Sequence, residues 1–399
     1  MKQVFRRLIL LFGLLLSGAQ VACSADTHDK NPDTVQVQVP WFSGGNYSSQ
    51  TVTLHTVKDM VTLQGDSARF LMSPGSQDGK LTGLQPKIRT MRTQDGIYVP
   101  EDYLSAQLLT LYAHFEKLSD LDVELGLNQS IQNWPRQQTI AVSVQTIDPT
   151  GQYGSDNAMY TGDYDAFLFL PYDRPDLPFS VNAGVIGHEH FHSLFFQQFI
   201  KPAADKYPFS APTAHPVTQL LQAMGLPVVL NTESQSSRTT DRDQYHAYLL
   251  RSLNEGLADV WGWVYSGDSR FVERSARGQE QRRLDFNSSI PLSTGQIMQM
   301  ATSSRVTSSG ITIDGSAYQI GTAYSHRLWQ AVQNSLVANK MSEIDARKKL
   351  AQGIMRAVVR LQSEFSGYDA TIKLDPLRPL QLIQEENPEL KINVNIWPQ

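Results

Sequence analysis

Hydrophobic and polar positions follow two different periods along this chain. Near its start, alternating positions predict strands over residues 34–42, 51–57, 68–72 and 87–91. Glycine and proline clusters between them predict turns. Further strands are expected over residues 139–146 and 166–170. The first part of the chain is therefore expected to be rich in β-structure.

Apolar residues at helical spacing begin near residue 101. They predict helices over residues 101–121, 181–199 and 243–265, with further helices around 342–361. The 101–121 segment carries Leu104, Leu108 and Leu111 at this spacing and is expected to pack in the core. Taken together, the strands and helices predict an α+β fold with a mainly helical C-terminal part.

The 181–199 helix carries the pattern His188-Glu189-x-x-His192. A helix turns once in about 3.6 residues, so His188 and His192 stand on one face, where two imidazoles can bind one Zn²⁺. Glu189 lies about 100° further round, where a general base for a metal-activated water is needed. The pattern is short enough to occur by chance, and an alternating strand through His188, His190 and His192 is the alternative interpretation.

A second segment carries acidic residues that could complete such a metal site. Asn254-Glu255-Gly256-Leu257-Ala258-Asp259 lies within the predicted 243–265 helix. Glu255 is expected to be the third protein ligand, which leaves a fourth position open for water. Asp259, one turn on, can accept a hydrogen bond from a ligand imidazole and fix its tautomer. A solvated helix face is the alternative, although the apolar neighbours would make unpaired carboxylates costly.

Together, these two patterns resemble the motifs of the gluzincin metallopeptidases, which include thermolysin and the aminopeptidase N family. The resemblance covers residues 157–329 discontinuously and implies a zincin-like catalytic domain built from a mixed sheet and an active-site helix. It implies that Zn²⁺ is the cofactor and that its ligands are His188, His192 and Glu255. It also implies that Glu189 is the general base and that Asn254 and Asp259 support the ligands through hydrogen bonds. The gap between His192 and Glu255 is longer than in those two families, so residues 201–242 are expected to form an insertion.

The resemblance extends to the stretch before the first of these helices. Thermolysin-like enzymes bind the substrate backbone with an Asn-Ala pair on the edge strand above the metal, and Asn157-Ala158 is similar. An exposed strand edge can bind an extended peptide as an added strand. An ordinary hairpin is the alternative. The motif whose glutamate binds the free substrate amine in aminopeptidase N is absent here, so an endopeptidase is expected.

Peptide hydrolysis also needs a donor to the carbonyl oxygen as negative charge develops, an interaction worth about 3 kcal/mol. Tyr318-x-x-Gly321 resembles the catalytic tyrosine of aminopeptidase N relatives, at a similar distance after Glu255. His326 is the rival, because thermolysin uses a histidine in this role, although the motif around His326 does not match. Core packing of both side chains is a further alternative.

Two other features leave their roles open. The 201–242 insertion would begin and end beside the two metal-binding helices, so it either rims the site or is a surface excursion. A basic run comprises Arg270, Arg274, Arg277, Arg282 and Arg283. It could clamp a substrate carboxylate, but the interleaved acidic residues favour a solvated face that pairs with itself.

The start of the chain predicts a targeting segment. Basic residues precede an apolar core at residues 8–16, which is too short for a comfortable transmembrane helix. The only cysteine, Cys23, follows this core, and the stretch resembles a bacterial lipoprotein signal, with Gln20 departing from its pattern. The resemblance implies a lipid on Cys23 and a membrane anchor in the cell envelope, periplasmic or at the outer membrane. Plain secretion is the alternative.

Composition is consistent with an exported globular protein. The chain has 399 residues, of which 41% are hydrophobic, and removing the three basic residues of the leader takes its formal charge from −5 to −8. This acidic balance argues against a nucleic-acid partner. The expected segments are a signal peptide (1–22), a tether (23–34), a small β-rich N-terminal domain (35–100), a zincin-like lobe with the metal-binding helix (101–200), the insertion (201–242), a mainly helical lobe (243–375) and a C-terminal tail (376–399).

The sequence therefore predicts an exported zinc peptidase of α+β fold that acts on peptides or proteins. Two alternatives stay open. One is a non-catalytic binding lipoprotein that keeps the zinc lobe as a scaffold. The other is a zinc hydrolase with a non-peptide substrate, because the metal chemistry alone does not identify the bond that is cleaved.

Overall fold

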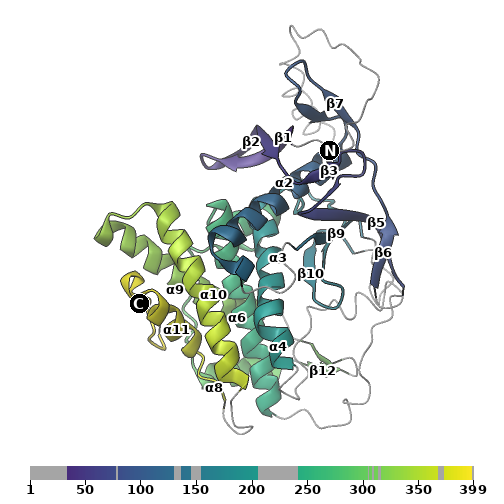
Figure 1. The fold of residues 1–399 in the computed structure, drawn as a ribbon. Helices are drawn as coiled ribbons and strands as arrows, with labels where there is room; N and C mark the ends of the chain where they lie inside the picture. The colour runs from purple at the N-terminus through teal and green to yellow at the C-terminus, as the bar shows by residue number, and fades with distance from the viewer. Residues whose placement is uncertain are drawn as a thin grey trace.

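A computed structural model describes residues 34–77, 80–129, 136–144, 154–204, 241–303, 305–307, 310–312, 316–366 and 373–397. The predicted signal peptide, Cys23 and most of the 201–242 insertion lie outside these residues. The fold is α+β, as predicted, with sheets and one long helix in the N-terminal half and helices in the C-terminal half (Figure 1). None of the helices in the described ranges is long and apolar enough to cross a membrane.

Two sheets occupy the N-terminal half. The first has the strand order β2-β1-β8-β7 and the second β10-β11-β9-β5-β6. In the second sheet, β9 runs parallel to β5 and β11, whereas the edge strands β10 and β6 are antiparallel to their neighbours. The strands of these sheets are β1 (Val35–Ser43), β2 (Asn46–Leu54), β5 (Ala68–Gln77), β6 (Lys80–Leu84), β7 (Thr90–Arg92), β8 (Tyr98–Pro100), β9 (Gln138–Val142), β10 (Ala158–Thr161) and β11 (Ala166–Phe169). Two short pairs complete the strands, β3 (Val57–Asp59) with β4 (Gln64–Gly65) and β12 (Arg305–Thr307) with β13 (Gly310–Thr312).

Strands β9, β10 and β11 of the second sheet are buried on both faces, and alternate residues pack into two cores. Ile140 and Phe167 point into the main core, on the face where the helix α2 (Tyr103–Glu124) packs, and the tilted rings of Phe115 on α2 and Phe167 have centroids 4.7 Å apart. Ala141 and Leu168 point into a smaller cluster on the opposite face. The alternation seen in the sequence therefore separates two apolar environments, not core from solvent.

The strands of residues 35–100 belong to both sheets: they build the first sheet entirely and contribute β5 and β6 to the second. Strands β5 and β6 come from that stretch, yet β5 pairs in parallel with β9, which follows α2. One hydrophobic core also runs from Val35 to Ile392. The second sheet therefore combines strands from both sides of residue 100, with α2 in the crossover that parallel strands require.

Helices form the rest of the molecule. The remaining helices are α3 (Ala183–Phe195), a π-helix (Phe196–Ile200), α4 (Lys201–Ala204), α6 (Asp241–Ser266), α7 (Phe271–Ser275), α8 (Thr294–Ser303), α9 (Ser316–Asn339), α10 (Glu343–Ser366) and α11 (Arg378–Glu386), with short 3₁₀ turns at Leu127–Gln129, Glu280–Arg282 and Pro388–Leu390. The helix predicted over 181–199 is α3 with its π-helical continuation, and the one predicted over 243–265 is α6. The predicted C-terminal tail contains α11, which packs on α10.

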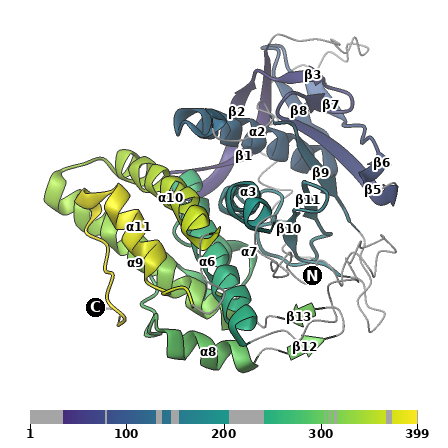
Figure 2. The same ribbon diagram turned by 60° about the horizontal axis from the view of Figure 1, so that its bottom comes forward.

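Helix α3 lies at the centre of the molecule. It contacts α2 on one side, β10 on another and α6 along its length, and α6 in turn contacts α9 (Figure 2). Because the three histidines of residues 188–192 lie within α3, the alternative of an alternating strand through them is wrong. The apolar residues flanking them are buried, which explains why this segment is a core helix.

Candidate metal centre

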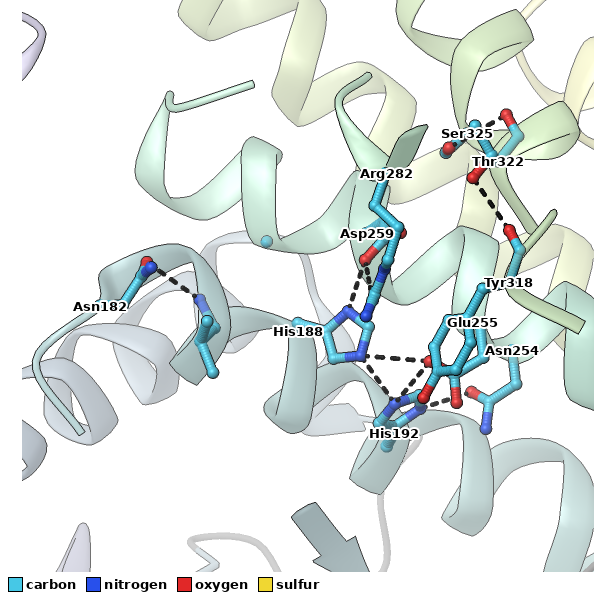
Figure 3. Close-up of polar contacts among 12 residues, drawn as sticks. Asn182, His188, His192, Asn254, Glu255, Asp259, Arg282, Tyr318, Thr322 and Ser325 are labelled. Carbon is cyan, nitrogen blue, oxygen red and sulfur yellow. Dashed lines mark hydrogen bonds and ion pairs between the residues drawn. The ribbon is translucent and has the colours of Figure 1, made fainter. Parts of the chain in front are cut away.

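The start of α3 is fixed by a buried capping residue. Asn182 accepts hydrogen bonds from the backbone N–H groups of Gly184 and Val185, as an N-cap residue does (Figure 3). Its amide nitrogen donates to Phe271 O and Ser275 Oγ of α7, each at 2.7 Å. These bonds set where the helix begins and therefore which face of α3 carries His188 and His192.

Glycines allow α3 and α6 to cross closely. A Cβ atom on Gly262 would lie 2.5 Å from Gly184 O, and one on Gly187 would lie 3.3 Å from the Cα of Gly262. Real Cβ atoms essentially never approach another atom closer than 3.0 Å, so only glycine fits at residue 262. Because Gly187 adjoins His188 and Gly262 follows Asp259 by one turn, this close crossing brings the two predicted motifs together.

Three donor atoms converge where the two helices cross. His188 Nε2 and His192 Nε2 are 3.0 Å apart, and Glu255 Oε2 lies 3.4 Å from the first and 3.7 Å from the second (Figure 3). All three side chains are buried. The structure thus brings together the three residues that the sequence predicts as metal ligands, from helices more than 60 residues apart in the chain.

The outer nitrogens of both imidazoles face acceptor oxygens. His188 Nδ1 lies 2.9 Å from Asp259 Oδ1, and His192 Nδ1 lies 3.0 Å from Asn254 Oδ1. An acceptor at Nδ1 places the ring proton there and leaves a lone pair on Nε2. Two nitrogen lone pairs and a carboxylate oxygen therefore face one another in a buried space, an arrangement that repels itself unless a cation lies between them.

The spacing of these atoms fits a small metal ion. The circle through the three donor atoms has a radius of about 2.0 Å, close to the zinc–nitrogen and zinc–oxygen distances of about 2.0–2.2 Å. The donors of His188, Glu189 and His192 also lie within 4.8 Å of one another. This buried histidine–glutamate–histidine group could hold a metal ion, and two nitrogens with a carboxylate oxygen are a donor set that suits zinc.

The pKa values of the two histidines shift in opposite directions. Burial lowers the pKa of His188, but its hydrogen bonds with Asp259 and Glu255 outweigh that effect and raise the pKa to about 9. Burial lowers the pKa of His192 to about 4, although the charge of Glu255 opposes it. Without a metal, one proton would therefore occupy the space between the three donors, and the second imidazole would stay neutral.

Glu189 lies beside the converging donors and is held by the neighbouring sheet. Its Oε2 accepts a hydrogen bond of 2.9 Å from the backbone N–H of Tyr160 on the edge strand β10. Burial raises the pKa of this carboxyl to about 7, with the charge of His188 opposing the rise and that of Glu255 adding to it. A carboxyl whose pKa lies near neutrality can both accept and return a proton at physiological pH.

Ala158 is the first residue of the edge strand β10, whose residues are all buried, and Asn157 directly precedes it. The Leu170 N–H donates to Asn157 O, so this pair is hydrogen-bonded between β10 and β11. In an antiparallel ladder, the backbone groups of Ala158 and Tyr160 then point away from β11, towards α3. Asn157 Oδ1 accepts the Ala158 N–H, and Glu189 accepts the Tyr160 N–H.

Tyr318 reaches the site because α9 crosses α6 at a pair of glycines. A Cβ on Gly256 would lie 2.4 Å from Gly321 O, and one on Gly321 would lie 3.0 Å from Gly256 N. Gly321 follows Tyr318 by one turn and Gly256 follows Glu255 directly, so the crossing sets the tyrosine beside the carboxylate (Figure 3). The Tyr318-x-x-Gly321 pattern thus contains the residue that permits the approach.

His326 lies two turns further along α9 and has different neighbours. Its Nδ1 contacts Leu284 O at 2.9 Å, and its ring stacks on Trp329. Tyr318, by contrast, accepts a hydrogen bond from Arg251, and the Arg282 guanidinium lies 4.4 Å from the centre of its ring. Of the two rivals for the donor role, only Tyr318 has contacts with residues that also bind Glu255 or Asp259.

Two arginines bind carboxylates of the site, a role that the sequence did not predict for either of them. Arg251 Nη2 lies 2.9 Å from Glu255 Oε1, and Arg282 Nη2 lies 2.7 Å from Asp259 Oδ1. Arg251 precedes Glu255 by four residues on one helix, a spacing that could have revealed it. Arg282 comes from a separate 3₁₀ turn, and no local spacing connects it with Asp259. Of the other four arginines in the basic run, Arg270 and Arg283 pair with interleaved carboxylates of the run, as the self-paired interpretation expects. Arg274 and Arg277 pair instead with Asp268 and Asp176, which lie outside it.

Comparisons with known proteins add no family to this geometry. No protein-family description matches the chain, and no curated protein matches it. Fold and site together therefore define an α+β protein whose central helix carries a buried His188–Glu189–His192 group that could hold a metal ion.

Proposed function

We propose that this protein is a zinc-dependent peptidase, with His188, His192 and Glu255 as metal ligands and Glu189 as the general base. This proposal rests on one observation: three buried acceptor atoms converge at spacings that fit one zinc ion. The two helical motifs resemble those of gluzincins, and the residues around the donors have the chemistry that such a reaction needs. When bound, zinc would polarise both a water molecule and the substrate carbonyl.

Glu189 moves the proton in this mechanism. In its ionised form it takes a proton from the attacking water, and in its protonated form it gives that proton to the leaving nitrogen. The Tyr160 N–H holds one carboxylate oxygen, so the other oxygen is the one available for proton transfer. Because burial raises the pKa of this carboxyl to about 7, both its ionised and its protonated form are accessible during one turnover.

Tyr318 would stabilise the negative charge that develops on the carbonyl oxygen. A hydroxyl aimed at that oxygen strengthens its hydrogen bond as the charge grows, which lowers the barrier by about 3 kcal/mol. The Arg251 and Arg282 guanidiniums beside Tyr318 favour negative charge near its hydroxyl. His326, with its contacts to Leu284 and Trp329, is not needed for this role.

An extended peptide would bind along β10. The carbonyl groups of Ala158 and Tyr160 point outwards from the sheet edge and can accept hydrogen bonds from substrate N–H groups. An edge strand accepts the middle of a chain as well as its end, which together with the missing amine-binding motif favours an endopeptidase. We further propose, from the leader sequence alone, that the protein is exported and lipidated on Cys23.

The variant Glu189→Gln tests the assignment. Glutamine keeps an acceptor for the Tyr160 N–H and so preserves the local fold, but it cannot take a proton. We expect the purified variant to retain wild-type zinc content and to lose hydrolysis of a peptide library by about 10²–10⁴-fold. Full hydrolysis by the variant would rule out Glu189 as the base.

The wild-type digest separates the alternatives. A chelator should abolish peptide cleavage, and added Zn²⁺ should restore it. A protein that binds zinc but cleaves no peptide would instead be a zinc hydrolase of another substrate or a non-catalytic binding protein. A protein that binds no zinc would remove the metal centre itself.

A further inference from the structure

Arg251 connects two groups of the candidate metal centre. It lies on α6, and its side chain is only 10% exposed. Its Nη2 atom lies 2.9 Å from Glu255 Oε1, and the guanidinium also donates a hydrogen bond to Tyr318. An ion pair at this distance is electrostatically strong in such a nearly dry environment, because little water screens it.

The two oxygens of Glu255 therefore face different partners. Oε2 faces the Nε2 atoms of His188 and His192, while Oε1 faces the guanidinium. A carboxylate can bind a metal through one oxygen or through both, and the choice decides how many positions remain for water and substrate. If Glu255 bound the metal through both oxygens, its ion pair with Arg251 would break. Breaking a buried ion pair costs free energy, because the Arg251 charge would lose this carboxylate.

We propose that Arg251 is a positioning residue that restricts Glu255 to one metal-binding oxygen and holds the Tyr318 hydroxyl beside the open side of the centre. The inference rests on the proposed metal centre, and it assigns to Arg251 a role that the ligand set alone does not require. One guanidinium thereby sets both the number of free coordination positions and the place of the donor to the carbonyl oxygen.

Binding of Co²⁺ in place of Zn²⁺ gives a direct readout of coordination number. The visible absorption of Co²⁺ is stronger with four ligand atoms than with five or six. In Arg251→Met, the freed Oε1 should turn towards the ion, and the absorption should fall by roughly twofold. Loss of a positive charge next to the cation should also tighten Zn²⁺ binding about tenfold in a chelator competition.

Arg347→Met is the matched control. Arg347 is 13% exposed and donates to the carbonyl oxygens of Trp263 and Val264 at the other end of α6. Arg347 belongs to α10, and its replacement removes a similarly buried guanidinium that packs against α6, so any general loss of packing around α6 should appear in both variants. The Co²⁺ absorption of Arg347→Met should equal that of the wild type.

The Co²⁺ spectrum decides the outcome. An unchanged spectrum in Arg251→Met overturns the proposal. A folded variant that no longer binds Co²⁺ also overturns it, because Arg251 would then be needed to position Glu255 and not to limit the number of its metal-binding oxygens. If Met at residue 251 prevents folding, Arg251→Gln is read by the same criteria. Failure of both variants to fold, while Arg347→Met folds, would assign Arg251 to the fold. A wild-type protein that binds neither Co²⁺ nor Zn²⁺ would instead refute the metal centre.

Discussion

Replacing Gly256 by alanine tests how the crossing of α6 and α9 positions the site. The new Cβ would lie 2.4 Å from Gly321 O, so the α9 backbone must shift by roughly 1 Å to restore an ordinary contact. Overpacking of this kind costs about 1–3 kcal/mol. Alanine recovers about 1 kcal/mol, because it is a better helix former than glycine. We therefore expect a net loss of unfolding free energy of about 0–2 kcal/mol.

The functional effect should exceed the loss of stability. Tyr318 lies one turn before Gly321, so the shift displaces its hydroxyl, whereas the proposed metal ligands on α3 and α6 keep their places. A displacement of 1 Å at a reacting group can slow catalysis by about 100-fold. Gly256→Ala should therefore retain zinc content and lose most peptide hydrolysis.

Three measurements on one preparation decide this prediction: metal content, thermal unfolding and turnover of a library peptide. Gly295→Ala in α8 is the control, because a Cβ there meets nothing within 4 Å. It should be as active as the wild type and at least as stable. If Gly256→Ala matched Gly295→Ala in both activity and stability, close packing at Gly256 would not position Tyr318.

Three further predictions concern other groups. Tyr318→Phe should slow peptide hydrolysis by about 100-fold with unchanged zinc content, and unchanged turnover would move the donor role elsewhere. Zn²⁺ at about 100 times its dissociation constant should raise the melting temperature by about 3–4 °C, and the double variant His188→Ala/His192→Ala should show no such shift in calorimetry. Burial lowers the pKa of His114 to about 3, below the model-peptide value of 6.5, so its unfolded state gains a proton first as the pH falls. The contribution of His114 to the free energy of unfolding is complete above pH 6.5 and about 2 kcal/mol smaller at pH 5. His114→Phe keeps a ring against Trp41 but cannot be protonated. Urea unfolding at pH 8 and pH 5 should therefore show a loss of stability about 2 kcal/mol smaller in this variant than in the wild type.

Much of the candidate site could be predicted from sequence because its parts obey short-range geometry. His188 and His192 share a face since both belong to one helix, and Glu255 and Asp259 do so for the same reason. The α+β class followed from the two hydrophobic periods. The strand at residues 68–72 was predicted, but its pairing with β9 was not, because β9 lies beyond α2 and no local pattern connects the two strands.

The amino-acid sequence by itself determined which donors stand together along each helix, because the rise and turn of a helix are properties of the backbone. Only the tertiary structure decided that the two helices cross at Gly184, Gly187 and Gly262, close enough for the donors to converge. It also decided that the Tyr160 N–H binds Glu189 and that Arg282 binds Asp259. Such pairs depend on how separate elements pack, and the free energy that selects one packing comes from the whole core.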